Sequence, residues 1–115
     1  MFAHRKLKVY QLSVSYLTSA KVIIKSLPPG NADLANELRR ASFSIALNIA
    51  EGAGKTGKDD KRRYYSIARG SALECAAIID VITAFELGNG DVLTDALGHL
   101  EQIAAMLSAL VIRKD

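Results

Sequence analysis

Polar residues recur at helical spacing between residues 38 and 52, along a line that an amphipathic helix would usually keep apolar. Steps of four, four and three residues separate them, which places their side chains in one stripe along a helix. The stripe consists of Arg40, Ser44, Asn48 and Glu51. A guanidinium, a carboxamide and a carboxylate in one stripe are groups that could bind a ligand, catalyse a reaction or pair two helices.

A second polar row occurs in the next segment of the chain. Gly70, Ser71 and Glu74 lie there at helical spacing, directly after Arg69. Because the two rows belong to consecutive segments, we expect them to face each other across a helix pair.

Chemistry at these rows would depend on Glu51 and Glu74. Carboxylates inside helical bundles can hold two metal ions, but such sites use Glu-x-x-His pairs, and no histidine lies three residues from either glutamate. Two carboxylates alone are too few ligands for an all-protein metal site. General acid–base catalysis by the pair is the least favoured hypothesis, since no nucleophile accompanies it. We therefore predict no catalytic residue, no metal and no cofactor.

The architectural interpretation is that the polar residues fix which helix faces meet. Arg40 can hold a carboxylate bidentately, and Ser44 and Asn48 can supply further hydrogen bonds. Glu51 has the alternative of remaining solvated at a helix end. The predicted structural network comprises Arg40, Ser44, Asn48, Glu51, Arg69, Ser71 and Glu74.

Cations cluster after the first polar row. The basic segment, residues 55–63, is a surface that either remains solvated or contacts phosphates, with Tyr64 and Tyr65 available for base stacking. A smaller basic group, His4 to Lys8, lies near the start of the chain. The candidate nucleic-acid-binding residues are Lys55, Lys58, Lys61, Arg62 and Arg63.

The whole chain has the composition of one helical domain, residues 1–115. Half of its residues are hydrophobic, its net charge is +3, and its two prolines are adjacent. Cys75 is the only cysteine, so no intramolecular disulfide can form, and its apolar neighbours indicate a buried thiol. We see no signal peptide and no uninterrupted membrane span, and we expect a cytoplasmic protein.

Hydrophobic periodicity predicts four helices, over about residues 5–26, 33–52, 59–87 and 91–113. Residues 28–30 (Pro-Pro-Gly) separate the first two helices, Gly52 and Gly54 end the second, and Gly88 and Gly90 follow the third. Either Asn31 or Asp33 caps the second helix and Asp91 caps the fourth. Helices of this length with short loops favour an antiparallel up-down-up-down four-helix bundle.

Two features of the later helices indicate burial on more than one side. Gly70 interrupts the third helix, which a close helix–helix approach would justify. The apolar surface of the fourth helix is wider than one core stripe needs, so we expect a homo-oligomer. The predicted core seam of the third helix is Tyr64, Ala68, Ser71, Cys75, Ile78, Ile82 and Phe85.

The polar rows carry a family resemblance. The run Asn48-Ile49-Ala50-Glu51-Gly52, followed by Arg69-Gly70-Ser71 and Glu74, resembles the signature of the four-helix bundle proteins encoded in 23S rRNA intervening sequences. The resemblance covers most of the chain and implies a four-helix bundle that assembles as a homopentamer. A more distant relative is the accessory variability determinant of diversity-generating retroelements, a pentameric bundle that binds nucleic acid.

These observations favour a non-enzymatic bundle that forms a homo-oligomer, a pentamer by resemblance, and binds RNA or DNA through its basic clusters. The alternative is a protein-interaction scaffold without nucleic-acid affinity. No pattern identifies a small-molecule substrate or a membrane partner.

Overall fold

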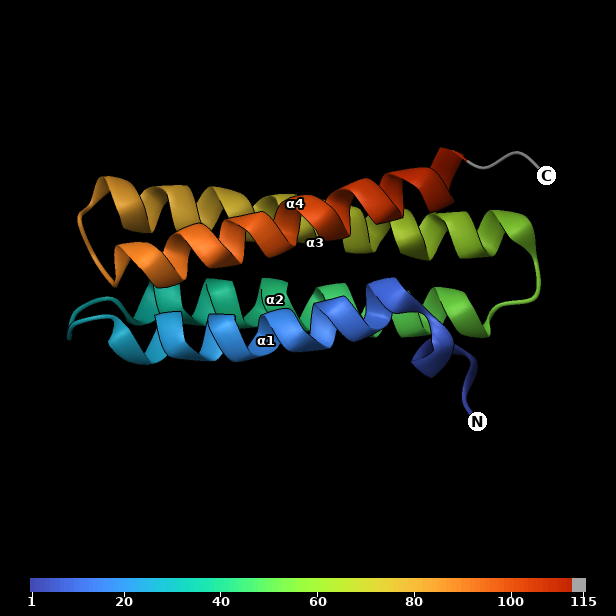
Figure 1. Ribbon diagram of the computed structural model, residues 1–115, viewed down its shortest axis with the longest axis horizontal. Helices are drawn as coiled ribbons and strands as arrows, with labels where there is room; N and C mark the ends of the chain where they lie inside the picture. The colour runs from blue at the N-terminus through green and yellow to red at the C-terminus, as the bar shows by residue number, and fades with distance from the viewer. Residues whose placement is uncertain (113–115) are drawn as a thin grey trace.

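The computed structural model describes residues 1–112 and contains four long helices (Figure 1). They are α1 (Lys8–Ser26), α2 (Ala32–Gly54), α3 (Lys58–Ala84) and α4 (Gly90–Ile112), preceded by the short 3-10 helix η1 (Ala3–Lys6). No strand occurs among the described residues, so the fold is all-α. The predicted end of the fourth helix at Arg113 lies outside the described residues.

The molecule is an elongated rod with principal extents of 46 × 25 × 21 Å. The N-terminus, the α2–α3 connection and the last turn of α4 lie at one end of this rod, and the α1–α2 and α3–α4 connections lie at the other (Figure 1). The two ends are therefore several Debye lengths apart at physiological ionic strength. Charges at one end act almost independently of charges at the other.

The first helix begins later than the predicted Arg5. Leu7 has an extended backbone, and its N–H donates to the carbonyl of His4, which closes η1 before α1 begins. The Gln11 side chain donates to the Arg5 carbonyl at 2.9 Å and supports this bend. The half-buried Leu7 packs against the core, so η1 folds back beside α2 instead of continuing the helix.

Gly52 was predicted to end the second helix, but it lies buried inside α2. A Cβ atom at Gly52 would approach Cε1 of Tyr65 to 2.8 Å, so only glycine lets α3 come this close. At Gly70, where the sequence predicted the close approach, an added Cβ atom would meet nothing within 4 Å. Within a single chain, the close approach of α2 and α3 requires Gly52 and does not require Gly70.

The end of α3 is set by Glu86 and not by the glycines after it. Glu86 has a φ of 57°, its N–H bonds to the Thr83 carbonyl, and the N–H of Leu87 reaches back to the Ile82 carbonyl. These are the two hydrogen bonds of a Schellman motif, with Glu86 at the position that glycine usually occupies. The helix therefore ends at Ala84, three residues before the predicted Leu87.

A different residue from the predicted one caps α4. The side-chain oxygen of Asn89 accepts hydrogen bonds from the backbone N–H groups of Asp91 and Val92, at 2.9 and 3.3 Å. Asn89 is thus the N-cap, and Asp91 lies in the first turn, where its charge suits the helix dipole. At α2, Asn31 holds the predicted cap position, but its side chain donates to the Pro28 carbonyl instead of capping.

The core positions of α3 differ in part from the prediction. Ala68, Cys75 and Ile82 are fully buried as predicted, and Ser71 is buried as well. The remaining core positions are Tyr65, Ala72 and Ile79. Ile78 is half-buried and packs against the core. Tyr64 is half-buried and Phe85 is 72% exposed, so the core predictions for Tyr64 and Phe85 were wrong.

Only part of the broad apolar surface of α4 is buried within the chain, and Ile112 is 72% exposed. Leu93, Leu100 and Leu107 are buried. Other apolar residues of α4, among them Leu97 and Met106, are partly buried against the core, where α4 packs on α1 and α3. By length and composition alone α4 could cross a membrane. Its exposed Asp95 and Glu101 would then enter hydrocarbon, so we interpret α4 as a core helix.

Candidate nucleic-acid interface

The two polar rows meet along the α2–α3 contact. Arg40 forms ion pairs with Glu74 across the helix pair and with Glu37 one turn before it. Ser44 Oγ lies 2.7 Å from Ser71 Oγ. The structure therefore brings four of the predicted network residues together.

The other network residues have separate partners. The Asn48 amide donates to the carbonyl and the hydroxyl of Ser44 at 2.9 and 3.0 Å, which keeps Asn48 on its own helix. Glu51 pairs with Lys55 at 3.4 Å. Arg69 Nε turns to the opposite side of α3 and donates to Ser108 of α4 at 2.6 Å. The predicted single network is thus divided into four groups, which are Arg40 with Glu74, Ser44 with Asn48 and Ser71, Glu51 with Lys55, and Arg69 with Ser108.

The Arg40–Glu74 ion pair lies at the surface of the single chain, whereas Ser71 is buried. The side chains of Arg40 and Glu74 are 59% and 40% exposed. Glu51 and Glu74 are held by different cations, on different parts of α2 and α3. No three His, Cys, Asp or Glu side chains among residues 1–112 gather closely enough to hold a metal ion.

A buried polar line that the sequence patterns did not indicate crosses the core. Tyr16 Oη lies 3.1 Å from Ser42 Oγ, which lies 3.6 Å from Cys75 Sγ. Burial raises the pKa of the Tyr16 hydroxyl far above its ordinary value, with the Cys75 sulfur adding to the rise. Burial also raises the pKa of the Cys75 thiol. This line joins α1, α2 and α3. The only sequence feature that points to it is Ser42, a polar residue on the core face of α2.

Both basic groups of the sequence converge at one end of the rod. η1 packs beside α2, and Leu7, which follows η1, lines a shallow pocket together with Lys58, Lys61 and Arg62 at the start of α3. Eight cations stand here against three carboxylates, whereas carboxylates outnumber cations in the other described residues. The cations of this basic end are Arg5, Lys6, Lys8, Lys55, Lys58, Lys61, Arg62 and Arg63, and its carboxylates are Glu51, Asp59 and Asp60.

Some of these cations also hold the fold. Lys61 Nζ donates to the carbonyls of Gly52 and Ala53 at 3.2 and 3.0 Å, so it satisfies the open C-terminus of α2. Arg62 pairs with Asp59 at 3.5 Å. Among the candidates, Lys61 therefore has a structural role, whereas Lys55 and Arg62 form surface ion pairs within their own helical segments, which contribute little to stability.

The remaining cations are presented outward. Tyr64 lies between Lys55 and Arg63, whose charged groups are 5.2 and 4.9 Å from its ring centroid. Lys58 is exposed and makes no hydrogen bond or ion pair within residues 1–112. Lys6 is likewise exposed without such a partner in that range. Tyr65 is buried against Gly52 and is not available for base stacking, contrary to the prediction.

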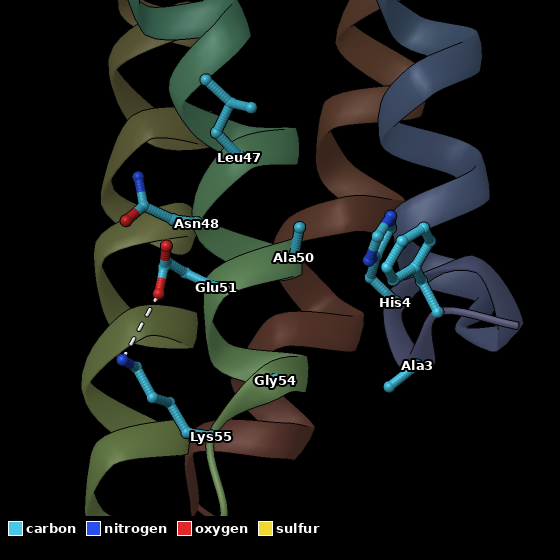
Figure 2. Close-up of a pocket in the computed structure, with 9 residues that line it drawn as sticks. Ala3, His4, Leu47, Asn48, Ala50, Glu51, Gly54 and Lys55 are labelled. Carbon is cyan, nitrogen blue, oxygen red and sulfur yellow. Dashed lines mark ion pairs between the residues drawn. The ribbon is translucent and has the colours of Figure 1, made fainter.

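A groove runs beside these cations on the surface of α2 (Figure 2). Leu47, Ala50 and Gly54 lie along the α2 side of it, and Asn48, Glu51 and Lys55 project on the side toward α3. η1 supplies the opposite wall, from which the labelled His4 faces the groove. The lining residues are Phe2, Ala3, His4, Leu47, Asn48, Ala50, Glu51, Gly54 and Lys55.

These features define an all-α four-helix protein with a basic end and, among its described residues, no recognisable catalytic constellation. The chain belongs to the 23S rRNA-intervening sequence protein family, whose model matches residues 5–109. The resemblance drawn from the polar rows is thereby confirmed.

A solved structure shows the same fold. It is the crystal structure of a protein of unknown function from the S23 ribosomal protein family of Bacteroides thetaiotaomicron VPI-5482. The TM-score is 0.83 at 17% sequence identity, and the match covers 91% of this chain and 99% of that one. No curated protein matches the chain. The comparisons thus indicate no catalytic family.

Proposed function

We propose that this protein is a non-enzymatic, cytoplasmic nucleic-acid-binding protein, built as an up-down-up-down bundle that assembles into a homopentamer. The basic end contacts phosphates, and assembly repeats that end several times on one particle. Repetition matters because phosphate contacts add through counterion release and because linked sites bind with avidity.

The observation that carries the binding proposal is the convergence of two basic groups that are about fifty residues apart in sequence. Lys6 on η1 and Lys58 at the start of α3 belong to the same end of the rod. Their ammonium groups have no carboxylate partner within the described residues, so both are available to phosphates. A solvated surface with no ligand would not require an eight-to-three excess of cations at one end.

The assembly proposal is supported by a second seam on α3. Outward positions of this helix recur in alternating steps of three and four, the spacing that packs one helix against another. Ile67 and Val81 on the seam are 45% and 43% exposed, and Gly70 opens into free space. A helix of another copy would cover this apolar surface and explain why a glycine is present in the middle of α3. The seam consists of Ile67, Gly70, Ala77 and Val81, with Glu74, which pairs with Arg40 of α2, at its middle position.

Binding is tested with charge reversals at the two ends of the rod. Lys6→Glu with Lys58→Glu should weaken binding of a fluorescent RNA or DNA oligonucleotide at least tenfold at low salt. Glutamate suits the first turn of α3, so the fold should be retained. Lys21→Glu with Arg39→Glu makes the same change in net charge away from the basic end and should have a much smaller effect. Equal losses from both pairs would contradict a localised interface, and no binding by the native protein at low salt would favour the interaction scaffold.

Assembly is tested with Gly70→Ala. Alanine fits the free space of the single chain and favours the helix by about 1 kcal/mol, so each chain should become slightly more stable. The same methyl group would obstruct a close helix contact between copies, so sedimentation or native mass spectrometry should show dissociation at a higher protein concentration. A native protein that is monomeric at micromolar concentration would refute the assembly.

A further inference from the structure

We infer that the groove between η1 and α2 receives an unstacked base, so that the basic end recognises single-stranded nucleic acid in preference to a duplex. This inference rests on the proposed function and specifies its ligand. It depends on the groove itself, which the phosphate contacts do not require.

One wall of the groove carries an exposed aromatic stack. The ring centroids of Phe2 and His4 lie 5.8 Å apart, with an interplanar angle of 19°. The rings of His4 and Tyr10 are arranged edge to face, with their centroids 4.6 Å apart. The guanidinium of Arg5 covers Phe2 at 5.3 Å from its ring centroid. Phe2 is nevertheless 66% exposed. Alternating aromatic and guanidinium planes are the surfaces on which proteins stack single-stranded bases.

The rim of the groove on the α3 side of α2 carries hydrogen-bonding groups that a base edge can use. The side-chain amide of Asn48 donates both of its hydrogen bonds to Ser44, so its side-chain oxygen can accept a hydrogen bond from a ligand. Glu51 adds carboxylate acceptors and Lys55 adds an ammonium donor beside them. Acceptors and a donor side by side suit the Watson–Crick edge of a base, which a duplex does not expose.

The floor between the walls is flat and shallow. Ala50 and Gly54 contribute almost no side chain, and a Cβ atom added at Gly54 would meet nothing within 4 Å. The groove has a volume of about 640 Å³, within the range of small-ligand sites. η1, which carries Lys6, and the start of α3, which carries Lys58, lie at the same end of the rod as the groove, so a strand bound in the groove has cations near it for its phosphates.

The chain contains no tryptophan, so a single Phe2→Trp substitution creates a specific reporter. Addition of a short single-stranded oligonucleotide should quench its fluorescence, because indole stacks on bases. Phe85→Trp is the matched control, since Phe85 is 72% exposed on the opposite end of the rod. Its fluorescence should not change. Quenching of both reporters, or of neither during measurable binding, would overturn the inference.

Affinity gives the second readout. Phe2→Ala should weaken single-strand binding about five- to hundredfold, the range expected for loss of one stacked base, and should leave duplex binding unchanged. Phe85→Ala should change neither. Equal native affinity for single strand and duplex would refute the groove while leaving the phosphate interface intact, provided that the Lys6 and Lys58 reversals still weaken binding. Absence of binding to either nucleic acid would refute both proposals.

Discussion

Single residues decide how closely the helices of this bundle approach. Tyr16, Ser42 and Cys75 place three polar atoms in the centre of the core, where each must be paired because water cannot reach it. Gly52 allows the ring of Tyr65 to lie against the α2 backbone. Both arrangements can be tested by substitutions that leave the surface unchanged.

The buried polar line predicts a loss of stability at alkaline pH. The folded chain keeps the protons of Tyr16 and Cys75, whereas the unfolded chain releases them above their ordinary pKa values of 10.0 and 9.0. Since the native state then binds more protons, the free energy of unfolding falls as pH rises. Urea unfolding should give a constant value from about pH 7 to 8.5 and a decline above it. Tyr16→Phe should remove much of the slope above pH 10, and an unchanged slope would contradict the buried hydroxyl.

The same burial predicts an unreactive thiol. Cys75 has no exposed surface, and its raised pKa lowers the thiolate fraction at neutral pH. A colorimetric thiol reagent should therefore not react with the native protein, and should titrate the single cysteine after unfolding in guanidinium chloride. Rapid reaction of the native protein would place Cys75 outside the core.

Gly52→Ala should destabilise the chain by about 1–2 kcal/mol. The added methyl group would contact the buried Tyr65 ring at 2.8 Å, and this overpacking exceeds the gain in helix propensity of about 1 kcal/mol. Gly54→Ala, two residues later in free space, is the control and should be neutral or slightly stabilising. Thermal unfolding of the two variants measures the difference. Equal melting temperatures would mean that the helices do not approach this closely.

At the scale of elements, the helix ends carry most of the differences between sequence and structure. Periodicity predicts four helices, because apolar residues at steps of three and four extend over each segment. It cannot predict that Glu86 adopts a left-handed conformation, since glycines lie two and four residues further on. Periodicity also assigns some core positions of the third helix to the wrong neighbour. Ser71 and Ile78 lie at heptad spacing from each other, and so do Ala72 and Ile79, and either pair can share a helix face with Cys75. Packing against both α2 and α4 decides between the two pairs.

Glu86→Gly tests the C-terminal motif of α3. A left-handed residue with a Cβ atom is strained by roughly 1 kcal/mol, so glycine should raise the free energy of unfolding by about 0.5–1 kcal/mol despite its greater freedom in the unfolded chain. Glu86→Ala keeps the strain and should not stabilise. Chemical denaturation compares the two, and a destabilising glycine would show that the helix does not end in this motif.

At the scale of the whole molecule, the placement of the candidate site depends on chain topology. The polar rows could be paired from sequence because their spacing fixes a helix face, and Arg40 with Glu74 fulfils that pairing. The groove could not be predicted, because it requires η1 to fold back beside α2 after the bend at Leu7. Nor does sequence show that Lys61 caps α2 while Lys58, three residues earlier, has no such bond among the described residues.

The salt dependence of binding tests most directly whether the basic end binds nucleic acid through its phosphates. The logarithm of the association constant for a single-stranded oligonucleotide should fall linearly with the logarithm of salt concentration, with a slope of about −0.7 for each phosphate contacted. Lys6→Glu with Lys58→Glu should make this slope shallower by more than one unit, whereas Lys21→Glu with Arg39→Glu should leave it unchanged. A slope near zero for the native protein, or equal slopes for the native protein and both variants, would show that the basic end does not contact phosphates.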